Sequence, residues 1–466
     1  MQMHFGARSR QTVISNARVR EVCDAVGGAI FVRRAFAINR DAFASGMRAA
    51  GVPSTPTAQE LDSEHPEKPY PANEADAKAL AELDERAVAD KATLESWALD
   101  PWTLEVEEVQ RLCCAMLHTH GLLRRFRISP SALKTFVSDV SLHYNDNAFR
   151  ACTLHALAWL TLAQHLTCVP RADNFRHAFM VAQICYLFLS DSTIRRKQLL
   201  EIDMLALLLA ALCHDLEHPG TTNAYQVNSG SALALRYNDS SVLENHHCSC
   251  CFVLLDRSGI LKQLEANEVK VLRRLIVAAV LATDSASPVM HIAVVSCTCV
   301  TRALSIPLPT VAVHKDLVAR VSAQANDSGA VTGVEASAGF SRELPEHREL
   351  LVSFLLHCAD LCCPLAPPPV SRRIAESLSV EFARQAERER AEGLPVTVPV
   401  AKDENAKAKM ELGFIDFVVR PLYLTLAIVA PGLGPRCLSL IECNRSAWAE
   451  IITVSDSETA SSRRSG

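Results

Sequence analysis

The chain has 466 residues, of which 49% are hydrophobic and 21% are charged, and its formal net charge is -5. This length can hold one large domain or a few ordinary ones, with enough residues for a sizeable core. The slightly acidic balance gives no reason to expect nucleic acid or an anionic membrane as the main partner. The apolar runs are shorter than the about 20 residues of a membrane-spanning helix. We therefore expect a globular, cytoplasmic protein without a membrane span.

Seventeen cysteines are spread along the chain without a regular spacing. In a chain of this size the pattern favours reduced thiols over a disulfide framework. Cys248, Cys250 and Cys251 could form a zinc cluster, but they lack the paired C-x-x-C arms of the usual structural zinc sites. We interpret them as buried thiols.

Residues 1–96 are predicted to form an N-terminal arm of unknown function that is partly disordered. Within it, residues 51–75 are rich in proline, acidic and small residues, which cannot bury enough apolar surface to become ordered. Residues 77–97 have a helical composition, and beyond them apolar residues recur at helical spacing. The globular part is therefore predicted over residues 97–452, with a disordered tail at 453–466.

Three apolar helices are predicted in the body of the chain, over residues 202–213, 268–283 and 347–359. The first is almost entirely apolar, as expected of a helix that is buried on all sides, and the acids at its start suit the helix dipole. Strand signals are scarce. The sequence therefore predicts an all-α fold, built as a compact multi-helix bundle.

An adjacent His214-Asp215 pair directly follows the first of these helices. His177 lies on an earlier helical segment, and Asp360 ends a later one. Two imidazoles and two carboxylates can thus converge from three segments, which suits a transition metal beside a second ion that prefers oxygen ligands. This is the chemistry of phosphoester hydrolysis.

Several longer motifs occur in a fixed order along the chain. Over most of Trp102 to Trp448 they make it resemble the class I cyclic nucleotide phosphodiesterases, whose catalytic domain is a multi-helix bundle of the HD-domain type. The motifs are N-x-x-H-A at 174–178, HDLEHPGTTNAYQ at 214–226, SALALRYNDSSVLENHH at 231–247, LATD at 281–284, HCADL at 357–361, EFARQAERE at 381–389 and GFIDFV at 413–418.

The resemblance implies specific roles for the site residues. The first metal, usually zinc, would be held by His177, His214, Asp215 and Asp360. Asp215 would also bridge to a second metal, usually magnesium and alternatively manganese. The remaining implied roles are orientation of metal-bound water by His218, Glu244 and Thr283, clamping of the purine ring by Phe382 and Phe414, and substrate binding by Asn223.

Three positions depart from the family pattern. The residue before Asn174 is a histidine that acts as the catalytic acid in the family, and here it is Asp173. The purine-binding glutamine is replaced by Glu411, which can only accept hydrogen bonds when it is ionised. A usual asparagine is replaced by Cys363. These departures put the acid step and the base preference in question.

Two inserts interrupt the family motifs, at about residues 150–173 and 285–311. Suitable codons would place a GT-to-AG intron at each point, in the same phase. Removal would restore the catalytic histidine at the first point and the sequence LATDMAVHKDL at the second. We therefore interpret both inserts as retained introns; the alternative is that they are natural surface loops.

The leading hypothesis is a 3',5'-cyclic nucleotide phosphodiesterase that hydrolyses cAMP or cGMP to the 5'-monophosphate in cyclic nucleotide signalling. The second is a catalytically impaired relative that binds metal and serves as a regulatory or scaffold module, supported by Asp173, Glu411 and Cys363. The third is another metal-dependent phosphohydrolase of the His-Asp type, which would not share the later motifs. The sequence permits an oligomer without indicating one.

Overall fold

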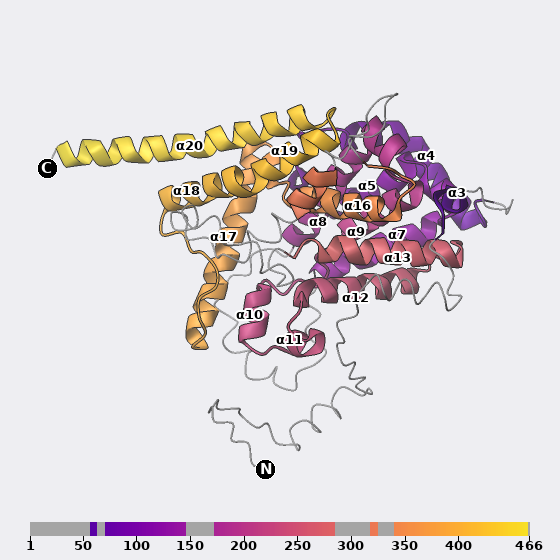
Figure 1. Cartoon of the computed structure of the whole chain (residues 1–466), viewed down its shortest axis with the longest axis horizontal. Helices are drawn as coiled ribbons and strands as arrows, with labels where there is room; N and C mark the ends of the chain where they lie inside the picture. Colours follow the sequence, from indigo (N-terminus) through magenta and orange to yellow (C-terminus); the bar gives the residue numbers. More distant parts are fainter. Residues whose placement is uncertain (1–55, 63–69, 146–171, 285–316, 325–339, 465–466) are drawn as a thin grey trace, which may run out of the picture. The chain divides into compact units, whose positions relative to one another are not determined.

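The computed structural model describes residues 56–62, 70–145, 172–284, 317–324 and 340–464. These residues belong to one compact unit, and the regular structure in this described part is helical (Figure 1). The α-helices are α3 (Ala58–Asp62), α4 (Glu74–Leu94), α5 (Val106–Thr119), α6 (Leu122–Arg125), α7 (Pro130–Asn145), α8 (Ala172–Leu189), α9 (Glu201–Cys213), α10 (Asn223–Asn228), α11 (Ala232–Tyr237), α12 (Val242–Ser258), α13 (Ala266–Leu281), α16 (Pro345–Asp360), α17 (Pro368–Ala391), α18 (Glu404–Phe414), α19 (Arg420–Val429) and α20 (Gly434–Arg464).

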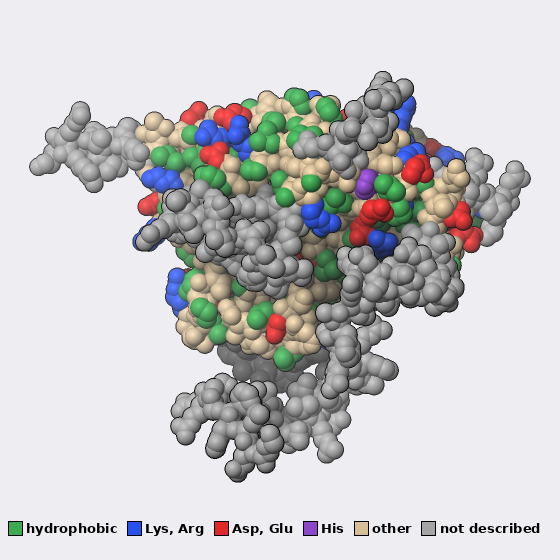
Figure 2. Space-filling view, viewed as in Figure 1, with side chains coloured by type: hydrophobic (Ala, Val, Ile, Leu, Met, Phe, Trp, Pro, Cys, Tyr) green, Lys and Arg blue, Asp and Glu red, His purple; other side chains and the backbone are tan. Residues whose placement is uncertain are grey.

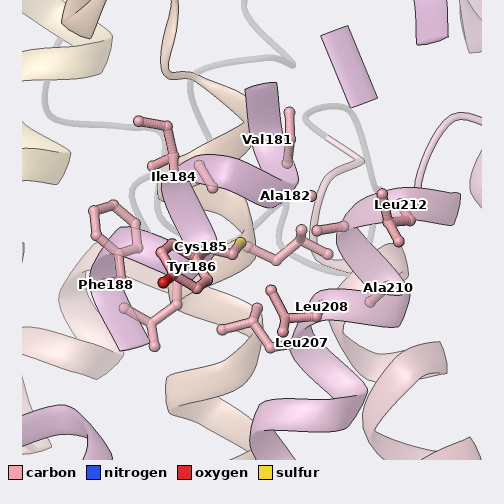
Figure 3. Close-up of a cluster of buried hydrophobic side chains, with 14 of the residues drawn as sticks. Val181, Ala182, Ile184, Cys185, Tyr186, Phe188, Leu207, Leu208, Ala210 and Leu212 are labelled. Carbon is pink, nitrogen blue, oxygen red and sulfur yellow. The ribbon is translucent and has the colours of Figure 1, made fainter. Parts of the chain in front are cut away.

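Helix α9 forms the centre of the bundle. Twelve of its thirteen residues are buried, and the helix packs against α8, α13 and α16. Figure 3 shows Leu207 and Leu208 of α9 beside Cys185 and Tyr186 of α8, within one continuous cluster of buried side chains. The all-α prediction and the three predicted apolar helices, seen as α9, α13 and α16, are confirmed.

A buried ion pair joins the N-terminal ends of α9 and α16. Arg348 Nε lies 3.0 Å from the Asp203 carboxylate, and both side chains are almost completely enclosed. The same carboxylate accepts a hydrogen bond of 2.8 Å from the Leu200 backbone amide, which caps α9. Arg348 also donates through Nη1 to the Arg342 carbonyl at 2.6 Å. The pair therefore fixes the relative position of two helices whose other ends carry the predicted metal ligands.

The compact unit begins before the predicted boundary at residue 96. Helix α4 packs against α5, α7 and α8 and buries Leu80 and Leu94. Asp76 accepts hydrogen bonds from the Ser129 and Ser131 hydroxyls, each at 2.6 Å, at the start of α7. An acidic residue of this region thus makes buried polar contacts, whereas the sequence-based prediction treated the acidic composition as a sign of disorder.

The C-terminal part of the bundle consists of α17 to α20. Gly434 at the start of α20 lies directly against Ala427 of α19. The Asn444 amide of α20 donates to the Pro364 and Ala366 carbonyls at 2.9 and 2.8 Å, just before α17. Helix α20 continues to Arg464. Helical structure thus extends beyond residue 452, where a disordered tail was predicted.

One helical stretch, Glu404–Val429, is long and apolar enough to cross a membrane by length and composition alone. Core helices often pass the same test, so the finding is weak, although Phe417, Leu424 and Ile428 are substantially exposed. Figure 2 shows hydrophobic side chains interspersed with acidic and basic ones on one face of the described residues. The expected absence of a membrane span therefore stays a prediction.

Candidate metal centre

The loop after α9 carries the first predicted ligands into the interior of the bundle. His214 caps the C-terminus of α9, and a tight turn follows in which the His218 amide donates to the Asp215 carbonyl at 3.1 Å. Glu217 and Gly220 both have positive φ, at 59° and 71°. Glycine adopts this region freely, whereas for glutamate it costs backbone energy. The loop is thus held in one shape by its surroundings.

His177, His214 and Asp360 meet at one point. Their ligand atoms all lie within 4.8 Å of one another. The Asp360 Oδ1 atom is 3.3 Å from His177 Nε2 and 3.2 Å from His214 Nε2. They come from the beginning of α8 and the ends of α9 and α16, as the sequence predicted for three of its four metal ligands.

The His214 imidazole is oriented as a metal ligand. Its Nδ1 atom lies 2.9 Å from the Ala211 carbonyl, which accepts only from a protonated nitrogen, so Nε2 carries the lone pair in the neutral ring. Nε2 is buried and has no hydrogen-bond partner in the described structure, although it is 3.4 Å from the Asp215 carboxylate. An orphaned imidazole nitrogen beside carboxylates fits a divalent cation.

The electrostatics of the centre also favour a cation. Burial alone would lower the pKa of His214, but the carboxylates of Asp215 and Asp360 raise it well above its usual value. Burial likewise opposes ionisation of Asp360, yet the His177 and His214 imidazoles beside it lower its pKa. The two carboxylates beside the buried imidazoles therefore stabilise a positive charge at this point.

Asp215 lies beside these three residues and also contacts side chains of α7 and α12. Its Oδ1 atom is 3.6 Å from His247 Nε2, and its backbone amide donates to the Tyr144 hydroxyl at 3.1 Å. Burial lowers the pKa of His247 to about 3, so this ring stays neutral. From the sequence, His247 could be either a ligand or a residue that only packs or hydrogen-bonds. Tyr144 was overlooked, because no spacing rule connects a tyrosine on α7 with a loop far along the chain.

Asn223 and Glu244 form a pair next to the metal centre. The Asn223 amide donates to both carboxylate oxygens of Glu244, at 3.1 and 2.9 Å, and its carbonyl accepts from the Leu243 amide at 2.9 Å. Burial, with a further contribution from Asp284, raises the pKa of Glu244 to about 8. The structure thus brings these two predicted site residues into direct contact.

The other predicted positions surround the centre less closely. His218 Nδ1 accepts a hydrogen bond from the Gly220 amide at 3.2 Å, and the Thr283 hydroxyl donates to the Val280 carbonyl at 2.8 Å. Phe382 on α17 and Phe414 at the end of α18 are both partly buried.

Glu411 and Cys363 lie near each other. The Glu411 carboxyl contributes to the raised pKa of the Cys363 thiol, of about 12, although burial is the larger cause. Burial also raises the pKa of Glu411 itself to about 7, against the opposing charge of Lys407. The premise that Glu411 is fully ionised therefore needs revision.

Several sequence-based predictions fall outside what the structure describes. The inserts at about 150–173 and 285–311 lie almost entirely outside the described residues, and the side chain of Asp173 does too. Of the clustered cysteines, Cys248 and Cys251 are buried free thiols, as predicted, while Cys250 is only partly buried.

Comparison with known proteins agrees with this geometry. The sequence is 29% identical over 359 residues to the high affinity cGMP-specific 3',5'-cyclic phosphodiesterase 9A of Homo sapiens, covering 77% of this chain and 50% of that protein. It is 28% identical over 408 residues to the 3',5'-cyclic-AMP phosphodiesterase 4C of Mus musculus, covering 85% and 55%. The chain thus spans about half the length of these curated relatives.

Solved structures show the same similarity. The crystal structure of the phosphodiesterase domain of the RhoPDE fusion protein from the choanoflagellate Salpingoeca rosetta matches with a TM-score of 0.61 and 29% identity, covering 78% of this chain and 97% of that one. The sequence profile described as 3'5'-cyclic nucleotide phosphodiesterase matches residues 173–439, which is more than half of the chain. This match includes all of the converging ligands, and the chain belongs to the 3'5'-cyclic nucleotide phosphodiesterase family.

Proposed function

We propose that this protein is a metal-dependent 3',5'-cyclic nucleotide phosphodiesterase that hydrolyses cAMP or cGMP to the 5'-monophosphate. The observation that carries the proposal is the unpartnered Nε2 atom of buried His214, held between the carboxylates of Asp215 and Asp360. The family match supports the choice of substrate class. We further propose a cytoplasmic location and a role in cyclic nucleotide signalling.

The chain's own residues divide the work at this centre. A zinc ion would be held by His177, His214, Asp215 and Asp360. Asp215 would also contribute to a second position that holds magnesium or manganese. Such a metal pair polarises a phosphoryl group and lowers the pKa of bound water. Glu244, oriented by Asn223, faces this region with a carboxyl that can hold or release a proton near neutral pH.

The base-binding side of the proposed pocket involves Glu411. Because burial raises its pKa to about 7, a large fraction of this carboxyl is protonated at neutral pH. A protonated carboxyl offers one donor and one acceptor, as the amide of glutamine does, whereas a carboxylate only accepts. Glu411 can therefore serve a purine edge in its acid form, with Phe382 and Phe414 on the neighbouring helices as the proposed ring contacts.

The test compares two purified proteins in hydrolysis assays with both cyclic nucleotides: the chain as written, and a version in which one histidine replaces residues 150–173 and one methionine replaces residues 285–311. We expect turnover at least in the shorter version, because it restores a histidine at the position of Asp173. Sequencing the transcript across both points checks the intron interpretation independently. If neither protein hydrolyses either nucleotide while both bind stoichiometric metal, the enzyme proposal is wrong and the scaffold alternative takes its place.

A pair of variants distinguishes loss of the metal centre from a general effect of substituting a histidine. His214→Ala should lose bound metal and activity together, because it removes the central ligand. His347→Ala, near the opposite end of α16 from Asp360, should lose neither. Metal content measured by mass spectrometry decides the comparison, and normal metal content in the His214 variant contradicts the assignment.

A further inference from the structure

A second group of metal-type ligands lies outside the centre described above. Glu217, His246 and Cys250 each offer one ligand atom, and these atoms all lie within 4.8 Å of one another. His246 Nε2 is 2.9 Å from the Glu217 carboxylate and 3.6 Å from Cys250 Sγ. The group therefore combines one nitrogen, one oxygen and one sulfur donor.

The backbone brings the three donors to one point. His246 and Cys250 are four residues apart on α12, so they project from the same face of that helix. Glu217 faces them from the loop after α9, where its φ of 59° is costly for a residue with a side chain. The group is largely shielded, since the His246 and Glu217 side chains are only 10% and 19% exposed.

Outer contacts fix the orientation of two of the donors. The second carboxylate oxygen of Glu217 is bound by His143 Nδ1 at 2.8 Å, which leaves the first oxygen directed at His246. On the far side of the His246 ring, the Tyr237 hydroxyl lies 3.4 Å from Nδ1. Metal-binding imidazoles and carboxylates usually have such outer partners, which set the ring orientation and the donor atom.

The spacing matches a tetrahedral ion. Zinc-to-sulfur and zinc-to-nitrogen bonds of about 2.3 and 2.0 Å place sulfur and nitrogen roughly 3.5 Å apart around a tetrahedral centre. The distance between Cys250 Sγ and His246 Nε2 is 3.6 Å. The separation of 2.9 Å between His246 and Glu217 is a direct hydrogen bond that must open by a few tenths of an ångström.

We propose that Glu217, His246 and Cys250 bind a divalent cation of the Zn²⁺ class at a site separate from the metal centre of His214. A simple hydrogen bond between Glu217 and His246 would not account for a thiol at the same point. A borderline-soft cation would, because it binds well to a mixture of nitrogen, oxygen and sulfur donors. Three protein ligands leave the fourth position to water or a small anion. The site does not depend on the proposed phosphodiesterase activity.

Cobalt provides a readout specific for this site. Co²⁺ replaces Zn²⁺ in such sites, and a bound thiolate gives it a charge-transfer absorption in the near ultraviolet that nitrogen and oxygen ligands do not give. The other centre contains no sulfur ligand, so the full-length protein loaded with Co²⁺ should show the band only through Cys250. Cys250→Ser should abolish it, and Cys443→Ser, which alters an exposed thiol on α20, should retain it.

The His177→Ala variant distinguishes the two sites, because it should lose metal at the first centre and keep the thiolate band. Absence of the band in the loaded wild-type protein, or its persistence in Cys250→Ser, overturns the proposal. A second measurement needs no variant: Zn²⁺ should protect Cys250 of the wild-type protein from alkylation by iodoacetamide, as read by peptide mass spectrometry. Equal alkylation with and without Zn²⁺ also overturns it.

Discussion

Replacement of the buried, positively charged Arg348 side chain should strongly destabilise the protein. In Arg348→Met the Asp203 carboxylate, which is fully enclosed and 3.0 Å from Arg348 Nε in the wild type, would lose its positive partner. The Arg342 carbonyl would also lose its donor at 2.6 Å. Breaking a buried ion pair by removing one partner typically costs about 3–5 kcal/mol, because the remaining charge stays buried. We expect a loss of this size in the free energy of unfolding.

A matched control is an exposed ion pair that also involves α16. Arg274 of α13 pairs with Glu349 of α16, but their side chains are 52% and 31% exposed. Exposed pairs contribute about 0–1 kcal/mol, so Arg274→Met should change the urea midpoint little. The reasoning is refuted if Arg348→Met is no less stable than Arg274→Met. The double variant Arg348→Met/Asp203→Leu should recover much of the loss, since no buried charge remains.

The same pair predicts a pH dependence with a defined sign. Burial raises the pKa of Asp203 from 3.8 to about 6 even beside Arg348, whose charge opposes the shift. Without the guanidinium the pKa rises further. Between 3.8 and the raised value the folded state binds more protons than the unfolded state, so stability falls as pH rises. The deficit of Arg348→Met, measured by urea unfolding, should therefore be larger at pH 8 than at pH 5.

Two further predictions concern packing and the buried acid. A Cβ atom at Gly434 would overlap Ala427, so Gly434→Ala should cost about 1–3 kcal/mol, whereas Gly393→Ala, at φ 69° with open space around it, should cost about 1 kcal/mol; equal urea midpoints would contradict this. In metal-free protein the pKa of Glu244 is raised from 4.5 to about 8, first by burial, so stability should fall as pH rises through that range. Glu244→Gln, which keeps an acceptor for Asn223, should flatten this slope in chelator-treated samples, and an unchanged slope would show that another group titrates.

The fold could be predicted from the sequence because its strongest signals are local. The apolar run that became α9 has no polar face, so it could only be a buried helix. The start of the helical unit was harder to place for the opposite reason. Asp76 looks like a solvent-exposed acid, and only the tertiary structure supplies the hydroxyls of Ser129 and Ser131 that bury it.

The site residues that lie together in one sequence motif could be predicted. Single residues contributed by distant segments of the chain could not. His214 and Asp215 are adjacent in the sequence, and their helix-end position could be inferred from hydropathy alone. Tyr144 and His143 come from α7 and carry no signal of their own, although both reach the loop after α9. The protonation of Glu411 depends on the depth of its burial, which only a three-dimensional structure provides.

The direct contact between His177 and Asp360 joins residues that are 183 positions apart in the sequence. Closing so long a loop is entropically costly and slow compared with forming the individual helices. A metal ion can therefore bind all three donors only after α8, α9 and α16 have docked. The rate of metal binding during refolding would therefore report on the docking of these three helices. The ion would stabilise the folded bundle and would not initiate its folding.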